Sequence, residues 1–385
     1  MRVTLLVCFA ATGPLTAQQT PAPRRTVELS GMVLVNGFFD NARVNNSDVP
    51  QFVDSLAPVS AGGGTIRQTR LGVFVTEPDV LGGSFSGEVD ADFFGGQQAS
   101  SGGRTFPLLR LRRAAGTVAW SHAQLLFGQE SPLVAERSPR SLASVGFPDF
   151  AGAGNLWLWL PQFRVTVEAG YTLRLAFQAA VLAPTSGAAQ GGFTTQPDSA
   201  ERSRRPFLEG RVRLGWGPTD DPSEFAIGAH QGWLRGFDAT TGDSLLSSQA
   251  LTADLRVKQG VVELLGEGFV GKALAGLGGG GIGQNTGAQG VPVRTHGGWA
   301  QLNVRPVREW MFGGGCGLDD PKDEDVLGAS LTGVGRLKNF VCEGHAEWRP
   351  PGPLVFGFEW RRLKTTWTKG EFTANHLNLA AGYRF

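Results

Sequence analysis

Apolar and polar side chains alternate at every second position in many segments of this chain. The last nine residues, LNLAAGYRF, put Leu377, Tyr383 and Phe385 on one face and Asn378 and Arg384 on the other. A period of two is that of a β-strand with one apolar face. About sixteen such segments recur between residues 27 and 385, each near the length that a tilted membrane-spanning strand needs.

The two faces of these segments differ in chemistry. In SFSGEVDADFF, Phe85 and Val89 alternate with Glu88, Asp90 and Asp92. A soluble β-sandwich also alternates, but it directs its apolar face to a core shared by two sheets. Charges on one face and bulky aromatic and aliphatic residues on the other favour a water-filled interior and a lipid-facing exterior. The pattern predicts an all-β, transmembrane antiparallel β-barrel over residues 27–385.

Aromatic residues gather near the ends of the apolar faces. Trp348 and Trp360, together with Tyr383 and Phe385, are typical of the aromatic girdles at membrane interfaces. An aromatic residue at the end of the last strand also resembles the signal that bacterial outer-membrane proteins present to their assembly machinery. We therefore expect Phe385 to be read by the barrel-assembly machinery and the barrel to contact outer-membrane lipid.

Composition is consistent with an exported membrane barrel. Only 18% of the residues are charged and 56 of 385 are glycine. Residues 1–17 have a basic start, a short apolar run and small residues up to Ala17, which is the layout of a secretory signal peptide. The predicted organisation is a signal peptide at 1–17, a short lead at 18–26 and the barrel, located in the bacterial outer membrane.

Charge and cysteine content limit the partners. Cleavage after Ala17 removes Arg2 and no acidic residue, which leaves 34 basic against 34 acidic residues. This balance argues against a nucleic-acid partner. Cys316 and Cys342 could pair in an exported chain, but two buried or lipid-facing thiols are the favoured interpretation.

The predicted connections alternate between short and long, with short turns at 76–83, 215–223 and 305–309. Long links are expected at 40–64, 129–161, 184–203, 234–245, 272–292 and 317–332. Short turns belong on the periplasmic side and long loops outside. The link at 130–161 carries Phe147, Phe150, Trp157 and Trp159, which are too apolar for a loop in free solution. We expect it to fold into the lumen as a constriction loop; packing on the outer rim or on a neighbouring subunit is the alternative.

Arginines accumulate on the predicted inward face. A ring of arginines lowers the cost of an anion entering a pore, because its carboxylate exchanges water for charge-assisted hydrogen bonds. The alternative is that these residues solvate the wall and pair with acids across strands. The candidate pore-lining and anion-contacting residues are Arg70, Arg110, Arg112, Arg137, Arg140, Arg164, Arg174, Arg211 and Arg213, and the candidate acidic wall is Glu88, Asp90 and Asp92.

Other chemical signals are weak. The glycine-rich stretch 276–287 lacks the Lys-Ser/Thr of a phosphate loop and is expected to be a flexible outside loop. Glu343, His345 and Glu347 share one strand face, but the usual histidine-rich metal set is absent. A lipid hydrolase would need a serine and a histidine together near the rim, and the chain has no Gly-x-Ser-x-Gly motif. We expect neither enzymatic activity nor a cofactor or metal.

Four motifs resemble the succession in DcaP-like outer-membrane porins. They are VDADFFGG (89–96), LRLRRAAGTVAW (109–120), LLFGQESP (125–132) and the FPDF of the long loop, and RQTRLGV (67–73) also resembles the family's second strand. The resemblance covers roughly residues 27 to 183. It implies a sixteen-stranded homotrimer that passes small organic anions such as dicarboxylates, with lumen arginines at Arg70, Arg110, Arg112, Arg137 and Arg140. The long helical segment that some members carry before the barrel has no counterpart between Gln18 and Val27.

The predicted function is therefore that of an outer-membrane porin for passive diffusion of small hydrophilic solutes, with a preference for organic anions. A barrel plugged by its loops and acting as a receptor or adhesin is the alternative. The lipid hydrolase is a third hypothesis.

Overall fold

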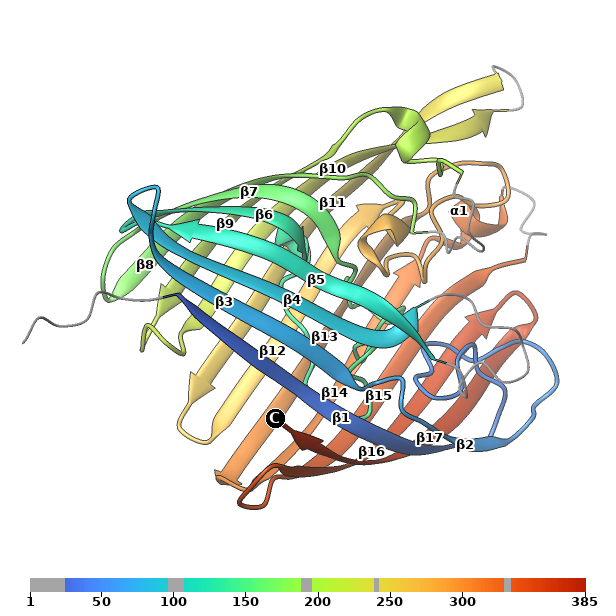
Figure 1. Ribbon diagram of the computed structural model, residues 1–385. Coiled ribbons are helices and arrows are strands. Elements are labelled where there is room, and N and C mark those ends of the chain that lie inside the picture. Colours follow the sequence, from blue (N-terminus) through green and yellow to red (C-terminus); the bar gives the residue numbers. More distant parts are fainter. Residues whose placement is uncertain (1–24, 96–106, 188–195, 239–241, 329–333) are drawn as a thin grey trace, which may run out of the picture.

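The chain forms one β-barrel (Figure 1). The computed structural model describes residues 25–95, 107–187, 196–238, 242–328 and 334–385. The predicted signal peptide and most of the lead that follows it lie outside the described residues. The strands are β1 (Thr26–Asp40), β2 (Ala61–Thr65), β3 (Arg70–Val80), β4 (Gly83–Gly95), β5 (Leu108–Ala119), β6 (Ala123–Glu130), β7 (Leu160–Ala169), β8 (Leu173–Leu182) and β9 (Phe207–Trp216).

The second half of the chain continues the same wall. Its strands are β10 (Ser223–Asp238), β11 (Gly242–Gln259), β12 (Val262–Lys272), β13 (Arg294–Val307), β14 (Trp310–Pro321), β15 (Arg336–Trp348), β16 (Leu354–Trp367) and β17 (Gly370–Arg384). Helical turns are short: η1 (Leu133–Ala135), η2 (Glu201–Ser203), η3 (Ala275–Leu277) and α1 (Asp323–Leu327). Among the described residues, no helix is long and apolar enough to cross a membrane.

The barrel has sixteen strand positions because β2 and β3 are two parts of one interrupted strand. β2 pairs with the second half of β1, from Asn36 to Asp40, and β3 pairs with its first half, from Thr26 to Met32. On its other edge β1 pairs with β17 in an antiparallel register that closes the sheet. The predicted antiparallel barrel of about sixteen strands is confirmed.

Alternation between outside and inside follows the sequence pattern. On β17, Leu379 is 65% exposed, whereas its neighbour Asn378 is 1% exposed. The inward face also carries apolar side chains where loops pack against it, such as Phe207 and Leu182. Loop segments that enter the lumen pack on these apolar side chains, so the lumen is partly filled.

Aromatic rings cluster on the outer face at the end where the chain terminates. Trp310 stacks on Phe312 and on Trp348, with ring centroids 5.5 and 5.9 Å apart, and Trp348 stacks on Phe356. Tyr383 and Phe385 lie beside one another at 6.2 Å. This arrangement fits an aromatic girdle at one membrane interface.

Connection lengths alternate between the two ends of the barrel. The tight turns are 81–82, 120–122, 170–172, 217–222, 260–261, 308–309 and 349–353, and the longer connections at the opposite end include 41–60, 131–159, 183–206, 273–293 and 322–335. The predicted long link at 234–245 is wrong. There, β10 and β11 continue as a paired hairpin, with Leu234 opposite Leu246, and only residues 239–241 between them lie outside the described residues.

Cys316 and Cys342 form a disulfide between β14 and β15. The interpretation as two separate thiols is wrong, although their outward parity is as the pattern indicated. The register places the two residues directly opposite each other with Cα atoms 4.0 Å apart. Pairing depends on strand register, which a spacing of 26 residues does not reveal.

We expect Gly31→Leu to destabilise the seam between the first and last strands. A Cβ atom at Gly31 would lie 2.5 Å from the Phe385 ring and 2.7 Å from the Arg70 carbonyl oxygen of β3, so both the terminal ring and the pairing of β1 with β3 must shift. Overpacking of this kind costs about 1–3 kcal/mol. The matched control is Gly37→Leu on the same strand, where no atom lies within 4 Å. The measurement is the urea concentration at the midpoint of unfolding of the refolded protein, with heat-modifiable gel mobility as the readout of folded protein. Equal midpoints for the two variants would contradict the prediction.

Candidate functional site

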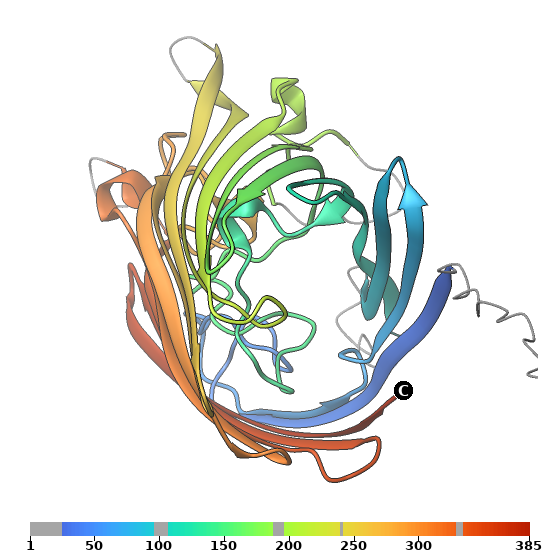
Figure 2. The same ribbon diagram turned by 90° about the vertical axis from the view of Figure 1, so that its left-hand side faces the viewer.

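The connection 131–159 folds into the barrel. Figure 2, viewed along the barrel, shows loop segments inside the ring of strands. Residues of this connection contact opposite sides of the wall. Ala143 accepts a hydrogen bond from Gln68, just before β3, and the Arg140 amide donates one to Gln301 of β13. The prediction of an inward constriction loop is confirmed. We call residues 131–159 the inward loop.

Ion pairs hold the first part of the inward loop against one side of the wall. Glu136 bonds to Arg164 of β7 at 2.6 Å and to Arg211 of β9 at 2.7 Å. Burial would raise the pKa of the Glu136 carboxyl, but Arg211 and Arg164 outweigh burial and hold that pKa below its ordinary value. Glu136 is therefore ionised at neutral pH and ties the loop to two strands.

The next two arginines of the loop are also paired with wall carboxylates. Arg137 bonds to Asp254 at 2.8 Å and also to Glu224, and Arg140 bonds to Glu263 at 2.5 Å. Two arginines that the sequence assigned to anion contact thus also serve to attach the loop.

Backbone carbonyls of the inward loop bind the opposite side of the wall. Arg110 donates to the Gly146 carbonyl at 2.7 Å and Arg112 to the Val145 carbonyl at 2.5 Å. Gln68, which precedes β3, donates to Ala143 and accepts from the amide of Val145. The sequence pattern missed Gln68, because a polar residue next to a strand start carries no signal of a contact made 75 residues away.

Aromatic rings of the loop form a stack with wall arginines. Phe147 lies edge-on to Phe94 of β4 at 5.2 Å and to Trp157 at 4.8 Å. The Arg110 guanidinium lies 4.8 Å from the Phe147 ring centre, and Arg112 lies 4.6 Å from that of Trp159. Cation–π contacts of this kind explain why the loop is rich in aromatic residues.

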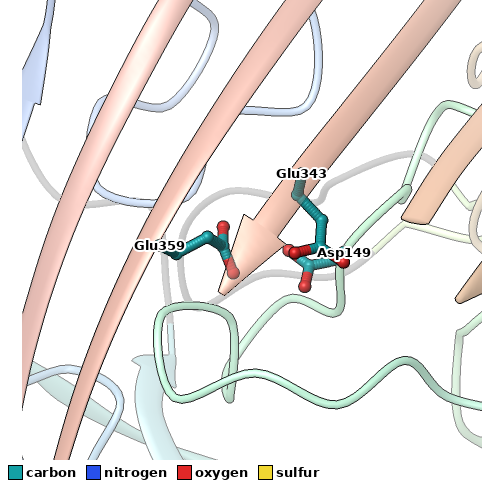
Figure 3. Close-up of side chains that lie close together, drawn as sticks. All are labelled: Asp149, Glu343 and Glu359. Atoms are coloured by element: carbon teal, nitrogen blue, oxygen red, sulfur yellow. The ribbon is translucent and has the colours of Figure 1, made fainter. Parts of the chain in front are cut away.

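Three carboxylates meet where the loop passes β15 and β16. Figure 3 shows Asp149 of the loop, Glu343 and Glu359 turned toward one another. One carboxylate oxygen of each lies within 4.8 Å of those of the other two. Such oxygens suit a divalent cation. Here Arg361 pairs with both Asp149 and Glu359, and His345 lies 2.9 Å from Glu343. Positive charge is thus already supplied by side chains.

The Asp149 carboxyl is held largely protonated at neutral pH. Burial raises its pKa from 3.8 to about 8; Arg361 opposes this, and the Glu359 and Glu343 carboxylates add to it. Three acids around one guanidinium cannot all ionise at low cost, so we infer that Asp149 carries the proton that they share.

The predicted acidic wall is paired with the predicted arginines. Asp90 bonds to Arg70 at 2.6 Å, Asp92 bonds to Arg110 at 2.6 Å, and Arg112 reaches both aspartates at 3.3 Å. A bulge in the pairing of β4 and β5 lies beside this cluster.

Because of that bulge, Arg113 also contacts inward carboxylates. It pairs with Glu88 at 3.1 Å and with Glu130 at 2.6 Å. Strict alternation places Arg113 on the opposite face from Arg112, so the pattern missed it. The cross-strand pairing that the sequence left as an alternative occurs at these residues.

Space remains in the lumen beside the inward loop. Two cavities of about 670 and about 380 Å³ share Arg70, Arg112, Ser138 and Val145 in their lining. Together they are lined by nine arginines and five carboxylates: Arg70, Arg112, Arg113, Arg137, Arg140, Arg164, Arg305, Arg349 and Arg384, with Glu88, Asp90, Glu130, Glu136 and Glu347. Positive charge exceeds negative charge along this lining.

Besides Arg113, three of the lining arginines are not among the pore-lining candidates predicted from the sequence. Arg305 lies on β13 and Arg384 on β17, and Arg349 follows β15, all near the tight-turn end. Arg349 pairs with Glu347, whereas neither Arg305 nor Arg384 forms an ion pair in the described part of the chain. They come from three separate segments of the chain, so no local cluster of basic residues signals the group.

The remaining predicted arginines lie elsewhere. Arg211 is buried and pairs with Asp254 as well as Glu136, and Arg213 pairs with Glu168 at 2.6 Å. Arg174 donates to the Gly217 carbonyl oxygen at 3.2 Å near the tight-turn end, and Arg110 is occupied by Asp92 and the inward loop. None of these four lines the two cavities described above.

The glycine-rich connection does not extend outward as a free loop. Leu277 accepts hydrogen bonds from the amides of Trp157 and Leu158, at 2.9 and 3.1 Å. A Cβ atom at Gly278 would lie 2.6 Å from the Leu158 nitrogen, so this close approach needs a glycine. The expectation of a flexible outside loop at 276–287 is wrong; the segment packs on the inward loop.

A Ser–His–Glu chain lies behind the loop. Ser248 is 3.3 Å from His230, which is 3.0 Å from Glu209. Ser248 is only 2% exposed and donates to the Ala273 carbonyl, while Glu209 accepts the Leu133 amide. The bond from Leu133 attaches the inward loop, and burial leaves Ser248 without the exposure that a nucleophile needs.

Solved structures of outer-membrane channels share this fold. The outer-membrane channel DcaP of Acinetobacter baumannii superposes with a TM-score of 0.69 at 16% identity, covering 94% of this chain and 98% of that one. An anion-selective porin from Comamonas acidovorans gives 0.59 at 14% identity over 94% and 100%. OprB of Pseudomonas putida gives 0.57 at 10% identity over 94% of both. No protein-family model and no curated protein matches the chain. The resemblance to DcaP-like porins is confirmed at the level of the fold.

We expect the attachment of the inward loop to weaken as pH rises from about 4 to about 8. The folded pKa of Asp149 lies above its ordinary value of 3.8, so the native state binds the extra proton across this window and loses it near pH 8. The urea midpoint of the wild type should therefore be lower at pH 9 than at pH 5. Asp149→Asn keeps the neutral shape and should reduce that difference. An undiminished pH dependence in the variant would contradict the assignment.

Proposed function

We propose that this chain is an outer-membrane porin that lets small hydrophilic solutes diffuse passively, with a preference for organic anions such as dicarboxylates. One observation carries the proposal: the two cavities beside the inward loop, which we take to form the passage for solutes, are lined by more arginines than carboxylates. The fold supports the general activity, because the matched solved structures are outer-membrane channels.

The physical basis of the anion preference is the charge that remains after internal pairing. Arg70 and Arg112 share Asp90, and Arg305 and Arg384 have no ion pair among the described residues. A guanidinium facing a hydrated passage can replace water around a carboxylate with charge-assisted hydrogen bonds. Arginines at the tight-turn end and beside the loop would therefore give a passing anion two successive contact points.

The inward loop narrows the lumen without occupying its whole section. Cavities lie on β1, β3, β4 and β5 on one side and against the loop on the other. Their volumes suit molecules of the size of metabolites. A plugged receptor or adhesin remains the competing function, and the absence of any solute flux through folded protein would favour it.

Assembly and location follow from the same proposal. OmpT of Vibrio cholerae, a structure with this fold at a TM-score of 0.55, was solved in a trimer form. We propose a homotrimer in the bacterial outer membrane. The C-terminal Phe385, whose backbone pairs with Gly31 at 3.1 Å, is proposed as the residue presented to the barrel-assembly machinery.

Liposome swelling tests the anion preference. The protein is reconstituted, and swelling rates in succinate and in an uncharged sugar of similar size are compared. The double variant Arg305→Gln, Arg384→Gln should lower the succinate-to-sugar ratio about twenty-five-fold, since each of the two cations contributes roughly 1 kcal/mol, or about a factor of five, to an anion at contact in water.

The matched control is Arg362→Gln, which removes the same kind of charge from an exposed position on the outer face of β16. The control should keep the wild-type ratio. An unchanged ratio in the double variant would refute the role of these arginines, and no swelling in any solute would refute the porin.

A further inference from the structure

A hollow of about 840 Å³ lies on the outer wall of the barrel, over β9 to β13. The side chains that border it from outside, including those of Leu208, Leu251, Val270 and Lys272, lie on the outward face of these strands. Leu251 and Val270 are 61% and 57% exposed, and with Leu208 they provide an aliphatic surface. This hollow is independent of the site described above.

Small residues create the hollow. Strand register places Gly210, Ala229, Leu251 and Val270 side by side in one row across four neighbouring strands. Gly210 and Ala229 leave the wall thin at one end of the row, where no large side chain fills the space. The adjacent row begins with Leu208, so the floor and one side of the hollow are apolar.

Cations border the hollow at the end nearest the longer connections. Lys272 of β12 lies directly opposite Arg294 of β13, and Lys322, which follows β14, donates its backbone amide to Arg294 at 2.8 Å. Neighbouring strands are spaced by roughly 4.8 Å, so three cations lie within about 10 Å of one another. His296 lines the same hollow one row below.

Two of these cations are available to a ligand. Arg294 is bound to Asp325 at 2.6 Å and to Glu324 at 3.3 Å. By contrast, neither Lys272 nor Lys322 forms an ion pair within the described ranges. Other outward lysines at this end are neutralised: Lys338 by Asp320 at 2.8 Å and Lys364 by Glu371 at 2.7 Å.

The row Gln231, Gln249, Lys272 and Arg294 marks the edge of the apolar band. On β12, outward residues are apolar from Val262 to Val270 and become basic at Lys272. An amphiphile lying along the wall would place its acyl chains on Leu251 and Val270 and its headgroup beside the lysines. A phosphate headgroup complements these cations in charge.

We propose that this hollow, bordered by Lys272, Arg294 and Lys322, binds a phosphorylated lipid of the outer leaflet. The inference rests on the proposed location in the outer membrane and on the long connections facing outward. It does not depend on what passes through the lumen. The bound lipid would fix the height of the barrel wall in the bilayer at β12 and β13.

Native mass spectrometry of the detergent-solubilised full-length protein tests the proposal. Diphosphorylated lipid A is the probe, with its dephosphorylated form and inorganic phosphate as comparisons. The wild type should retain lipid A in preference to the dephosphorylated form, and inorganic phosphate should not displace it. The double variant Lys272→Gln, Lys322→Gln should bind about thirtyfold more weakly, because each basic residue contributes roughly a fivefold factor at a lipid surface.

Two further variants separate charge from shape. Ala229→Phe fills the hollow without changing charge and should also weaken retention, whereas Lys364→Gln removes an outward lysine at the same end of the barrel and should leave it unchanged. The wild type, the double lysine variant and these two variants should all show the same conductance. A failure of lipid binding can then be told apart from a failure of the porin function. Wild-type retention by the double variant would overturn the proposal, as would displacement by inorganic phosphate. Loss of oligomers, rather than of lipid, in Ala229→Phe would assign the hollow to a second copy of the chain.

Discussion

Closure of the sheet is the constraint on which the rest of the structure depends. In a bilayer core an unpaired backbone amide or carbonyl has no water to bond, so a sheet can span the membrane only without free edges. Here β17 pairs with β1 as far as Phe385, whose backbone exchanges two hydrogen bonds of 3.1 Å with Gly31. The terminal aromatic residue is thus part of the seam, and the apolar face of every strand turns outward as a consequence.

Closure also creates an interior that the chain has to fill without blocking. The inward loop is attached by charge pairs such as Glu136 with Arg211 and Arg137 with Asp254, and by arginine contacts to its carbonyls. Buried pairs of this kind contribute little net stability, but breaking one leaves an unpaired charge. They therefore define one position of the loop, and among the described residues they leave Arg305 and Arg384 without an ion pair in the lining of the larger of the two cavities beside it.

Periodicity predicted the barrel and the outward faces, and the aromatic composition of one long link predicted the inward loop, because each depends on local alternation or on the composition of one segment. Features that depend on strand register could not be predicted from the sequence pattern. The bulge beside Arg112 turns Arg113 to inward carboxylates, and the disulfide needs Cys316 opposite Cys342. Several arginines of the predicted ring, such as Arg70, pair with acidic residues and are not free cations. Arg305 and Arg384 line the same cavity because strands far apart in the sequence curve around one lumen.

The reversal potential across a planar bilayer under a potassium chloride gradient tests the central claim most directly. If the passage beside the inward loop is open and its arginines exceed its carboxylates, the refolded wild type will show discrete conductance steps. The sign of its reversal potential will then show that chloride permeates more readily than potassium. A reversal potential of the sign for potassium would contradict the charge assignment, and a silent bilayer with correctly folded protein would contradict the open passage.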